Sequence, residues 1–207
     1  MSLSIGIVGL PNVGKSTLFN ALTDSEILAA NYPFATIEPN TGIVPVPDER
    51  LQKLADIYGS TKLLPATVTF VDIAGLVAGA SKGEGLGNQF LANIRNCDAI
   101  VHVVRAFVNN DIVHVNDNVS PVDDIEIINT ELILADIQTI DKRLPKIQKE
   151  AKANPKKRDE LGYLESLKRH LESGTPLSAL PSVDHEAIAD LHLLTAKPVL
   201  YACNVEE

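Results

Sequence analysis

The chain has 207 residues, of which 45 % are hydrophobic and 22 % are charged, a composition that excludes an intrinsically disordered or fibrous protein. The formal net charge is −9, so any contact with nucleic acid requires a local basic patch. The only two cysteines, Cys97 and Cys203, lack the spacing of a metal site, which favours a reducing, cytoplasmic environment. No basic leader is visible and no apolar run approaches about 20 residues, so we expect no secretion and no membrane insertion.

Four short apolar runs predict the strands of a parallel sheet. They lack the polar alternation of half-exposed strands, as expected for strands that are covered on both faces. An amphipathic stretch over residues 16–28 follows the first run at once and predicts a helix. The sequence therefore predicts an α/β fold with a doubly wound, mostly parallel sheet. The four runs are residues 3–8, 67–71, 99–107 and 198–203.

Between the third and fourth runs the hydrophobic pattern becomes that of a coiled coil. The spacing alternates between four and three residues and resumes after Asn154 and Pro155, which predicts an antiparallel helical hairpin inserted at residues 125–194. Residues 1–124 and 195–207 then form the α/β domain. Two ordinary helices packed on the sheet are the alternative. The repeating positions are Ile133, Ile137, Ile140, Leu144, Ile147 and Ala151, then Leu161, Leu164, Leu167 and Leu171.

The central stretch of this insertion is basic, although the whole chain is acidic. Residues 142–170 contain ten Lys or Arg against four Asp or Glu, and Lys156, Lys157 and Arg158 concentrate the charge at the expected tip. Aromatic residues make up 4 % of the chain, so stacking on single-stranded bases is a poor hypothesis, and a phosphate backbone is the better one, without DNA sequence specificity. A solvated helix face is the alternative interpretation.

The segment between the first strand and the first helix has the spacing of a phosphate-binding P-loop. Residues 9–16 fit G-x-x-x-x-G-K-[ST], and the motif stands after a strand and before a helix, as its mechanism requires. Lys15 should bridge the β- and γ-phosphates, Ser16 should ligate Mg²⁺, and Thr17 should contact the α-phosphate. The predicted nucleotide-binding residues of this loop are Asn12, Val13, Gly14, Lys15, Ser16 and Thr17.

A second phosphate motif, Asp72 to Gly75, follows the next apolar run. Its aspartate should hold a Mg²⁺-bound water, and Gly75 could offer a backbone N–H to the γ-phosphate. The glycine-rich residues 75–87 predict a mobile switch. Residues 31–42 are too irregular for a helix or strand and predict a first switch, in which Thr36 or Thr41 would be a further Mg²⁺ ligand.

The motifs GLPNVGKST, NYPFATIEPNTG and DIAGLVAGASKGEGLGNQFL, together with the helical insertion, resemble Obg-related P-loop GTPases and most closely the Obg-like ATPases of the YchF subfamily. The resemblance extends over essentially the whole chain. It implies a Ras-like G domain, Thr36 rather than Thr41 as the Mg²⁺ ligand, a cytoplasmic ATPase associated with ribosomes and stress responses, and a C-terminal TGS domain beyond this chain.

The base-recognition motif departs from that of the GTPases. They use Asn-Lys-x-Asp, whose carboxylate accepts from guanine, whereas this chain has Asn204, Val205, Glu206 and Glu207. Adenine lacks the two guanine donors, and an asparagine can pair with its N7 and 6-amino groups, so we predict ATP over GTP. The alternatives are an Obg-type GTPase, or a module that binds ribosomal RNA and uses the nucleotide structurally.

Catalysis needs a group that orients water, and Leu76 stands where Ras-type enzymes have a glutamine. His114, which follows the third apolar run, is the predicted replacement, because a neutral imidazole can accept a hydrogen bond from water. Unassisted turnover should be about 10⁻⁴–10⁻² s⁻¹. Asn12 suggests help from K⁺ as a weaker hypothesis, because several relatives hold this ion at the same position.

Overall fold

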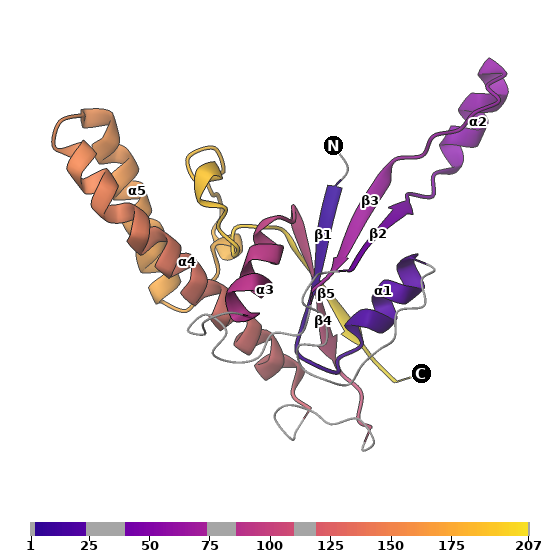
Figure 1. Cartoon of the computed structure of the whole chain (residues 1–207), viewed down its shortest axis with the longest axis horizontal. Coiled ribbons are helices and arrows are strands. Elements are labelled where there is room, and N and C mark those ends of the chain that lie inside the picture. Colours follow the sequence, from indigo (N-terminus) through magenta and orange to yellow (C-terminus); the bar gives the residue numbers. More distant parts are fainter. Residues whose placement is uncertain (1–2, 24–39, 74–85, 110–118, 207) are drawn as a thin grey trace.

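The computed structural model describes residues 3–23, 40–73, 86–109 and 119–206, and Figure 1 shows their arrangement. A five-stranded sheet with the strand order β2-β3-β1-β4-β5 forms the centre. The four strands β1 (Leu3–Val8), β3 (Thr67–Asp72), β4 (Ala99–Arg105) and β5 (Val199–Asn204) run parallel, as predicted. Their carboxyl ends therefore meet at one edge of the sheet, where ligands bind in such folds.

Helices cover both faces of the sheet (Figure 1). Helix α1 (Lys15–Thr23) lies on one face, and α3 (Leu86–Arg95) lies on the other with the first half of α4 (Pro121–Ala151). The main core forms between these layers, so the predicted doubly wound α/β fold is confirmed. Its fully buried members include Ile7, Val8, Phe19, Ile73, Ile94, Ile100 and Ile128.

The segment after the first predicted switch contains structure that the sequence did not predict. Residues 40–42, which we expected to be irregular, begin strand β2 (Asn40–Pro45), which pairs antiparallel with β3. Helix α2 (Glu49–Tyr58) follows, with Asp48 accepting from Arg50 N at its start and Gly59 in the left-handed region at its end. The signal was weak because β2 is a short edge strand with alternating exposure rather than an apolar run.

The expectation that the strands are covered on both faces is correct for β4 and wrong for β5. Residues Ile100 to Arg105 of β4 are all buried. In β5, Leu200 and Tyr201 are 65 % and 45 % exposed. The difference lies in what covers the faces, because α4 packs against β4, whereas β5 is the last strand of the described order and pairs with β4 alone.

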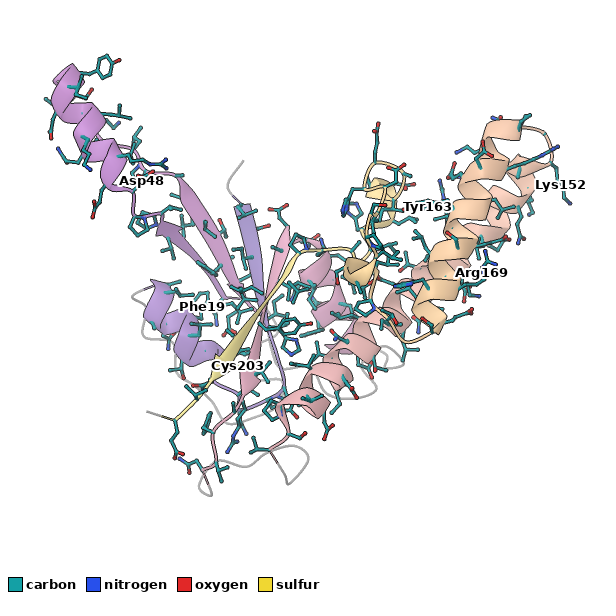
Figure 2. All side chains as sticks on the ribbon, turned by 180° about the vertical axis from the view of Figure 1, so that it is seen from behind. Phe19, Asp48, Lys152, Tyr163, Arg169 and Cys203 are labelled. Atoms are coloured by element: carbon teal, nitrogen blue, oxygen red, sulfur yellow. The ribbon has the colours of Figure 1, made fainter. Side chains whose placement is uncertain are left out.

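The predicted insertion contains a helical hairpin that projects from the sheet (Figures 1 and 2). Helix α4 runs for 31 residues and continues through Pro145, and α5 (Pro155–Glu172) folds back against it. Helix α4 begins four residues before the predicted boundary at 125, because Pro121 occupies its first turn, where a proline costs no hydrogen bond. The predicted seam forms the second core, which includes Ile133, Ile140, Ile147, Leu164, Leu167 and Leu171.

A buried carboxylate fixes the hairpin to the segment that returns to the sheet. Asp136 of α4 is fully buried and accepts from Leu194 N at 2.8 Å and from Thr195 N at 2.8 Å. The Thr195 hydroxyl donates to the same carboxylate at 2.7 Å. The return segment contains two short 3₁₀ turns, η1 (Leu177–Ala179) and η2 (Ala189–Leu191), and leads directly into β5.

Candidate functional site: the phosphate-binding loop

The loop between β1 and α1 has a backbone that only particular residues tolerate. Gly9 has φ +154°, and a Cβ there would lie 2.4 Å from the carbonyl oxygen of Val103 in β4. Gly14 has φ +102°, and Asn12 has φ 61°, which asparagine adopts more readily than most residues. The glycines of the predicted motif are therefore required by the close approach to β4 and by the turn into α1.

Lys15 lies inside this loop with little exposure to solvent. Its side chain is 7 % exposed, and Nζ donates to the carbonyl oxygen of Leu10 at 2.7 Å. Burial lowers the pKa of Lys15 to about 8, and the negative charge of Asp72 opposes this shift. An ammonium group that has lost its water and donates to a carbonyl oxygen would be stabilised by an incoming anion, as expected for a phosphate-binding lysine.

Ser16 and Asp72 come together although 56 residues separate them in the chain. The Ser16 hydroxyl donates to Asp72 Oδ2 at 3.0 Å, while the buried Oδ1 atom has no hydrogen-bond partner among the described residues. Burial raises the pKa of Asp72, and the Ser16 hydrogen bond and the Lys15 charge act in the opposite direction. A hydroxyl oxygen beside an unsatisfied carboxylate oxygen fits the oxygen ligands that Mg²⁺ prefers.

Asn204, at the end of β5, reaches the same loop. Its Nδ2 atom donates to the carbonyl oxygen of Val13 at 3.0 Å, and a Cβ on Gly14 would lie only 2.5 Å from this nitrogen. The backbone also holds the end of the strand, because Ala106 N donates to the Asn204 carbonyl at 2.7 Å. Val205 follows with its side chain 64 % exposed. The predicted base-recognition residue thus lies against the predicted phosphate loop.

The remaining predicted site residues are not all described. Gly75, Thr36, His114 and Glu207 lie outside the described residues. Thr17 is exposed in the first turn of α1, and Thr41, the alternative to Thr36, is exposed in β2 opposite Val71. Within the described parts of the chain, no three His, Cys, Asp or Glu side chains gather as a metal-binding group. The candidate Mg²⁺ ligands among the described residues are therefore Ser16 and Asp72.

The predicted nucleic-acid contacts lie at the hairpin tip, far from the P-loop (Figure 1). Lys157 Nζ pairs with Glu160 and lies 3.9 Å from a carboxylate oxygen of Glu150. Arg158 Nε donates to the carbonyl oxygen of Ala151 at 3.1 Å, near the end of α4. The side chain of Lys156 lies outside the described part of the chain.

Two residues of β4 near the P-loop, His102 and Arg105, are buried although their side chains are basic. His102 is opposite Val8 in the sheet, and burial lowers its pKa to about 4, assisted by the charge of Lys15. Arg105 is 1 % exposed and donates to the carbonyl oxygens of Phe107 and Asn109 at 3.2 and 3.1 Å. The available signal was a basic residue within an otherwise apolar strand.

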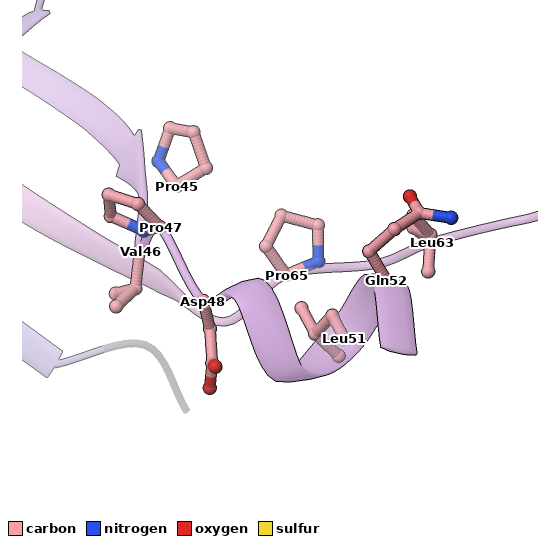
Figure 3. Close-up of a pocket in the computed structure, with 8 residues that line it drawn as sticks. All are labelled: Pro45, Val46, Pro47, Asp48, Leu51, Gln52, Leu63 and Pro65. Carbon is pink, nitrogen blue, oxygen red and sulfur yellow. The ribbon is translucent and has the colours of Figure 1, made fainter. Parts of the chain in front are cut away.

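A hollow in the β2–α2–β3 arm is a separate feature (Figure 3). It has a volume of about 350 Å³ and is lined largely by apolar side chains, among them Pro45, Leu51, Leu63 and Pro65. None of its lining residues belongs to the P-loop. The hollow is therefore not part of the phosphate site.

Comparison with known proteins agrees with this geometry. The family model described as 50S ribosome-binding GTPase matches residues 4–153, which include the P-loop, β3 and all of α4. The chain belongs to this family. It is 57 % identical over 210 residues to proteins named ribosome-binding ATPase YchF from Haemophilus ducreyi and Escherichia coli O157:H7. The protein of that name from Bacillus subtilis is 54 % identical.

A solved structure supports the family assignment through the fold. The structure of the Schizosaccharomyces pombe YchF GTPase matches all of this chain with a TM-score of 0.77 and 40 % sequence identity. The resemblance to YchF proteins is therefore confirmed. The chain spans 57 % of that solved chain and 58 % of the Escherichia coli relative. Among the described helices, none is long and apolar enough to cross a membrane.

Proposed function

We propose that this chain is the catalytic part of a cytoplasmic, ribosome-associated ATPase, which binds ATP with Mg²⁺ at the P-loop and hydrolyses it slowly to ADP and phosphate. The supporting observation is the cluster of Lys15, Ser16 and Asp72, in which one carboxylate oxygen has no hydrogen-bond partner among the described residues and the ammonium group is desolvated. The names of the bacterial relatives, ribosome-binding ATPase, favour the same activity.

Each residue of the cluster has a distinct role in this proposal. Lys15 exchanges the Leu10 carbonyl for β- and γ-phosphate oxygens, and its positive charge stabilises the negative charge of the transferred group. Ser16 would supply its hydroxyl oxygen as a ligand of Mg²⁺, and Asp72 would accept a hydrogen bond from a water bound to the metal. Mg²⁺, when bound, neutralises charge on the β- and γ-phosphates.

Residues outside the described parts complete the proposed site. Thr36 is the further Mg²⁺ ligand, Gly75 offers its backbone N–H to the γ-phosphate, and His114 orients the attacking water. K⁺ at Asn12 is the weaker hypothesis of this proposal. In this proposal residues 1–124 and 195–207 form the nucleotide-binding domain, residues 125–194 form the insertion, and a TGS domain follows in the complete protein.

The base preference rests on Asn204. One of its two amide hydrogens binds Val13, which leaves one N–H for adenine N7 and the carbonyl oxygen for the 6-amino group. Val205 stands where Asn-Lys-x-Asp has a lysine, and its exposed side chain is short and carries no charge. A mispaired polar contact costs about 1–3 kcal/mol, so ATP should bind roughly 5- to 150-fold more tightly than GTP.

Phosphate release by the purified protein tests the activity. With Mg²⁺ we expect repeated turnover of ATP at about 10⁻⁴–10⁻² s⁻¹ and slower turnover of GTP. Asp72→Asn should lower the rate and weaken the Mg²⁺ dependence, whereas Asp56→Asn, at an exposed position on α2, should match the wild type. His114→Ala should lose hydrolysis but retain ATP binding. Faster turnover of GTP would contradict the base assignment and favour an Obg-type GTPase. The S. pombe relative is named a GTPase, which agrees with that alternative.

A binding module that uses nucleotide structurally is the remaining alternative. Residues 142–170 of the hairpin support the ribosome-facing part of either proposal, because their ten Lys or Arg against four Asp or Glu contrast with the −9 of the whole chain. Ribosomal RNA is the expected partner, with Lys156, Lys157 and Arg158 as the candidate contacts predicted from the sequence. Tight ATP binding without any turnover, in the presence of Mg²⁺ and ribosomes, would favour the module.

A further inference from the structure

Strand β4 ends in an arginine whose side chain is almost completely buried. Arg105 is 1 % exposed, whereas Ala106, Val108 and Asn109 in the loop that follows it are exposed. Moving a guanidinium group out of water costs free energy, and an apolar side chain like that of its neighbour Val104 would avoid this cost. The contacts that compensate the buried charge therefore indicate what Arg105 does.

The guanidinium group of Arg105 binds the loop that leaves the strand. Its Nε atom donates to the carbonyl oxygen of Phe107 at 3.2 Å, and its Nη2 atom donates to that of Asn109 at 3.1 Å. The Cζ atom lies 4.5 Å from the centre of the Phe107 ring, which is a cation–π contact. Residues 106–109 belong to no helix or strand, so these side-chain bonds take the place of regular backbone pairing. One side chain thus fixes the course of the four residues after β4.

This loop begins at the phosphate edge of the sheet. Arg105 is opposite Asn204 in the pairing of β4 with β5, and Ala106 N donates to the Asn204 carbonyl at 2.7 Å. The side chain of Asn204 binds the P-loop. The carbonyl of Val103, two residues before Arg105, is the atom that Gly9 of the P-loop approaches. Arg105 therefore orients a loop whose first residue is anchored beside the candidate nucleotide site.

We propose that Arg105 is a positioning residue for ATP hydrolysis, because it sets the direction in which the chain leaves β4 toward the residue that orients the attacking water. This inference rests on the proposed function, which assigns that role to His114. His114 lies outside the described residues, five positions after Asn109, and five residues span at most about 18 Å. A connection this short transmits an error in the direction of its first residues, and a misplacement of about 1 Å can cost about 100-fold in rate.

The geometry separates this role from a direct contact with the nucleotide. An arginine that stabilises the charge on a transferred phosphate must present its N–H groups to that phosphate. The guanidinium group of Arg105 instead donates to two main-chain carbonyls and lies over the Phe107 ring. Its loss should therefore slow hydrolysis and leave the affinity for ATP unchanged.

Two substitutions separate the hydrogen bonds of Arg105 from its charge. Arg105→Lys keeps the charge but lacks the planar fork that reaches both carbonyls. Arg105→Met removes the charge together with the donors, and it avoids the cost of burying a charge, so it should fold even if the lysine variant does not. The matched controls are Arg169→Lys and Arg169→Met, because Arg169 is exposed on α5 and donates to the Glu165 carbonyl at 3.4 Å. Circular dichroism verifies that each variant is folded.

Three measurements are made on each variant. Calorimetry gives the Kd of an ATP analogue that cannot be hydrolysed, single-turnover hydrolysis with protein in excess gives the rate of the chemical step, and hydrogen exchange compares a peptide of residues 106–118 with one from the P-loop. Both Arg105 variants should bind within about twofold of the wild type and hydrolyse ATP about 10- to 100-fold more slowly. Exchange in residues 106–118 should become about tenfold faster, with the P-loop peptide unchanged. The Arg169 variants should match the wild type throughout.

A wild-type rate in the folded Arg105 variants would overturn the proposal. Slower hydrolysis without faster exchange in residues 106–118 would overturn it in favour of a direct contact with the phosphate. A loss of affinity as large as the loss of rate would assign Arg105 to nucleotide binding and also overturn it. In these cases the wild type is active and His114→Ala is not. Absence of hydrolysis by the wild type, or a wild-type rate in His114→Ala, would instead refute the proposed function, and this inference with it.

Discussion

Replacing Lys15 with methionine tests whether the ammonium group is buried at a cost in stability. Burial moves its pKa from 10.5 to about 8 in the folded protein. Between these values the unfolded chain binds more protons than the folded one, so the contribution of this lysine makes stability rise with pH. Lys15→Met removes that contribution. Between pH 7 and pH 10, the free energy of unfolding of the nucleotide-free wild type should therefore rise by about 2.5 kcal/mol relative to that of the variant.

Urea denaturation of both proteins at pH 7, 8, 9 and 10 measures this difference. Titrations elsewhere in the chain affect both proteins and cancel. Lys53→Met is the control, because Lys53 is an exposed residue of α2, and its difference from the wild type should stay within about 0.5 kcal/mol at every pH. The reasoning is refuted if the free-energy difference between wild type and Lys15→Met does not change across this range.

Three further predictions concern Lys15, Asp136 and Gly14. ATP binding at pH 8 should take up about half a proton as phosphate restores the charge of Lys15, and about a tenth at pH 7, measured by calorimetry in buffers of different ionisation enthalpy. Asp136→Ala should destabilise the protein by about 3–5 kcal/mol in urea denaturation, because two buried N–H groups and the Thr195 hydroxyl lose their acceptor; a loss below about 1 kcal/mol would contradict this. Gly14→Ala should weaken ATP binding at least tenfold in the same calorimeter, because its Cβ would displace Asn204 and its backbone has φ +102°; unchanged affinity would show that Asn204 is not needed.

The phosphate loop could be predicted from the sequence because its chemistry is local. Glycines at fixed spacing, a lysine and a serine specify the turn within eight residues, and the flanking strand and helix follow directly. The heptad seam of the hairpin could be predicted for a similar reason, since Ile140 and Ile147 are fixed by periodicity.

Contacts that join distant segments could not be predicted with the same detail. That Asp72 lies beside Ser16 was foreseeable from the parallel sheet. That its Oδ1 atom is buried without a hydrogen-bond partner among the described residues depends on the packing around it. Strand β2 was missed because an edge strand carries no continuous apolar run. Helix α2 was missed although the residues that cap it, Asp48 and Gly59, are visible in the sequence. The engagement of Arg158 with Ala151 depends on how α5 folds back, which composition does not record.

The burial of Asp136 explains why a charge persists in the hairpin core. Moving a carboxylate out of water costs free energy, and burial raises the pKa of Asp136. Its three hydrogen-bond donors and the charge of Arg95 act in the opposite direction. An apolar side chain would avoid that cost, but it could not accept from Leu194 N and Thr195 N, which would then be buried without partners. These two residues stand just before β5, whose last residue, Asn204, binds the P-loop at Val13. The carboxylate therefore fixes the hairpin relative to the strand that carries the base-recognition residue, with buried hydrogen bonds where a flexible linker would allow the two to move apart.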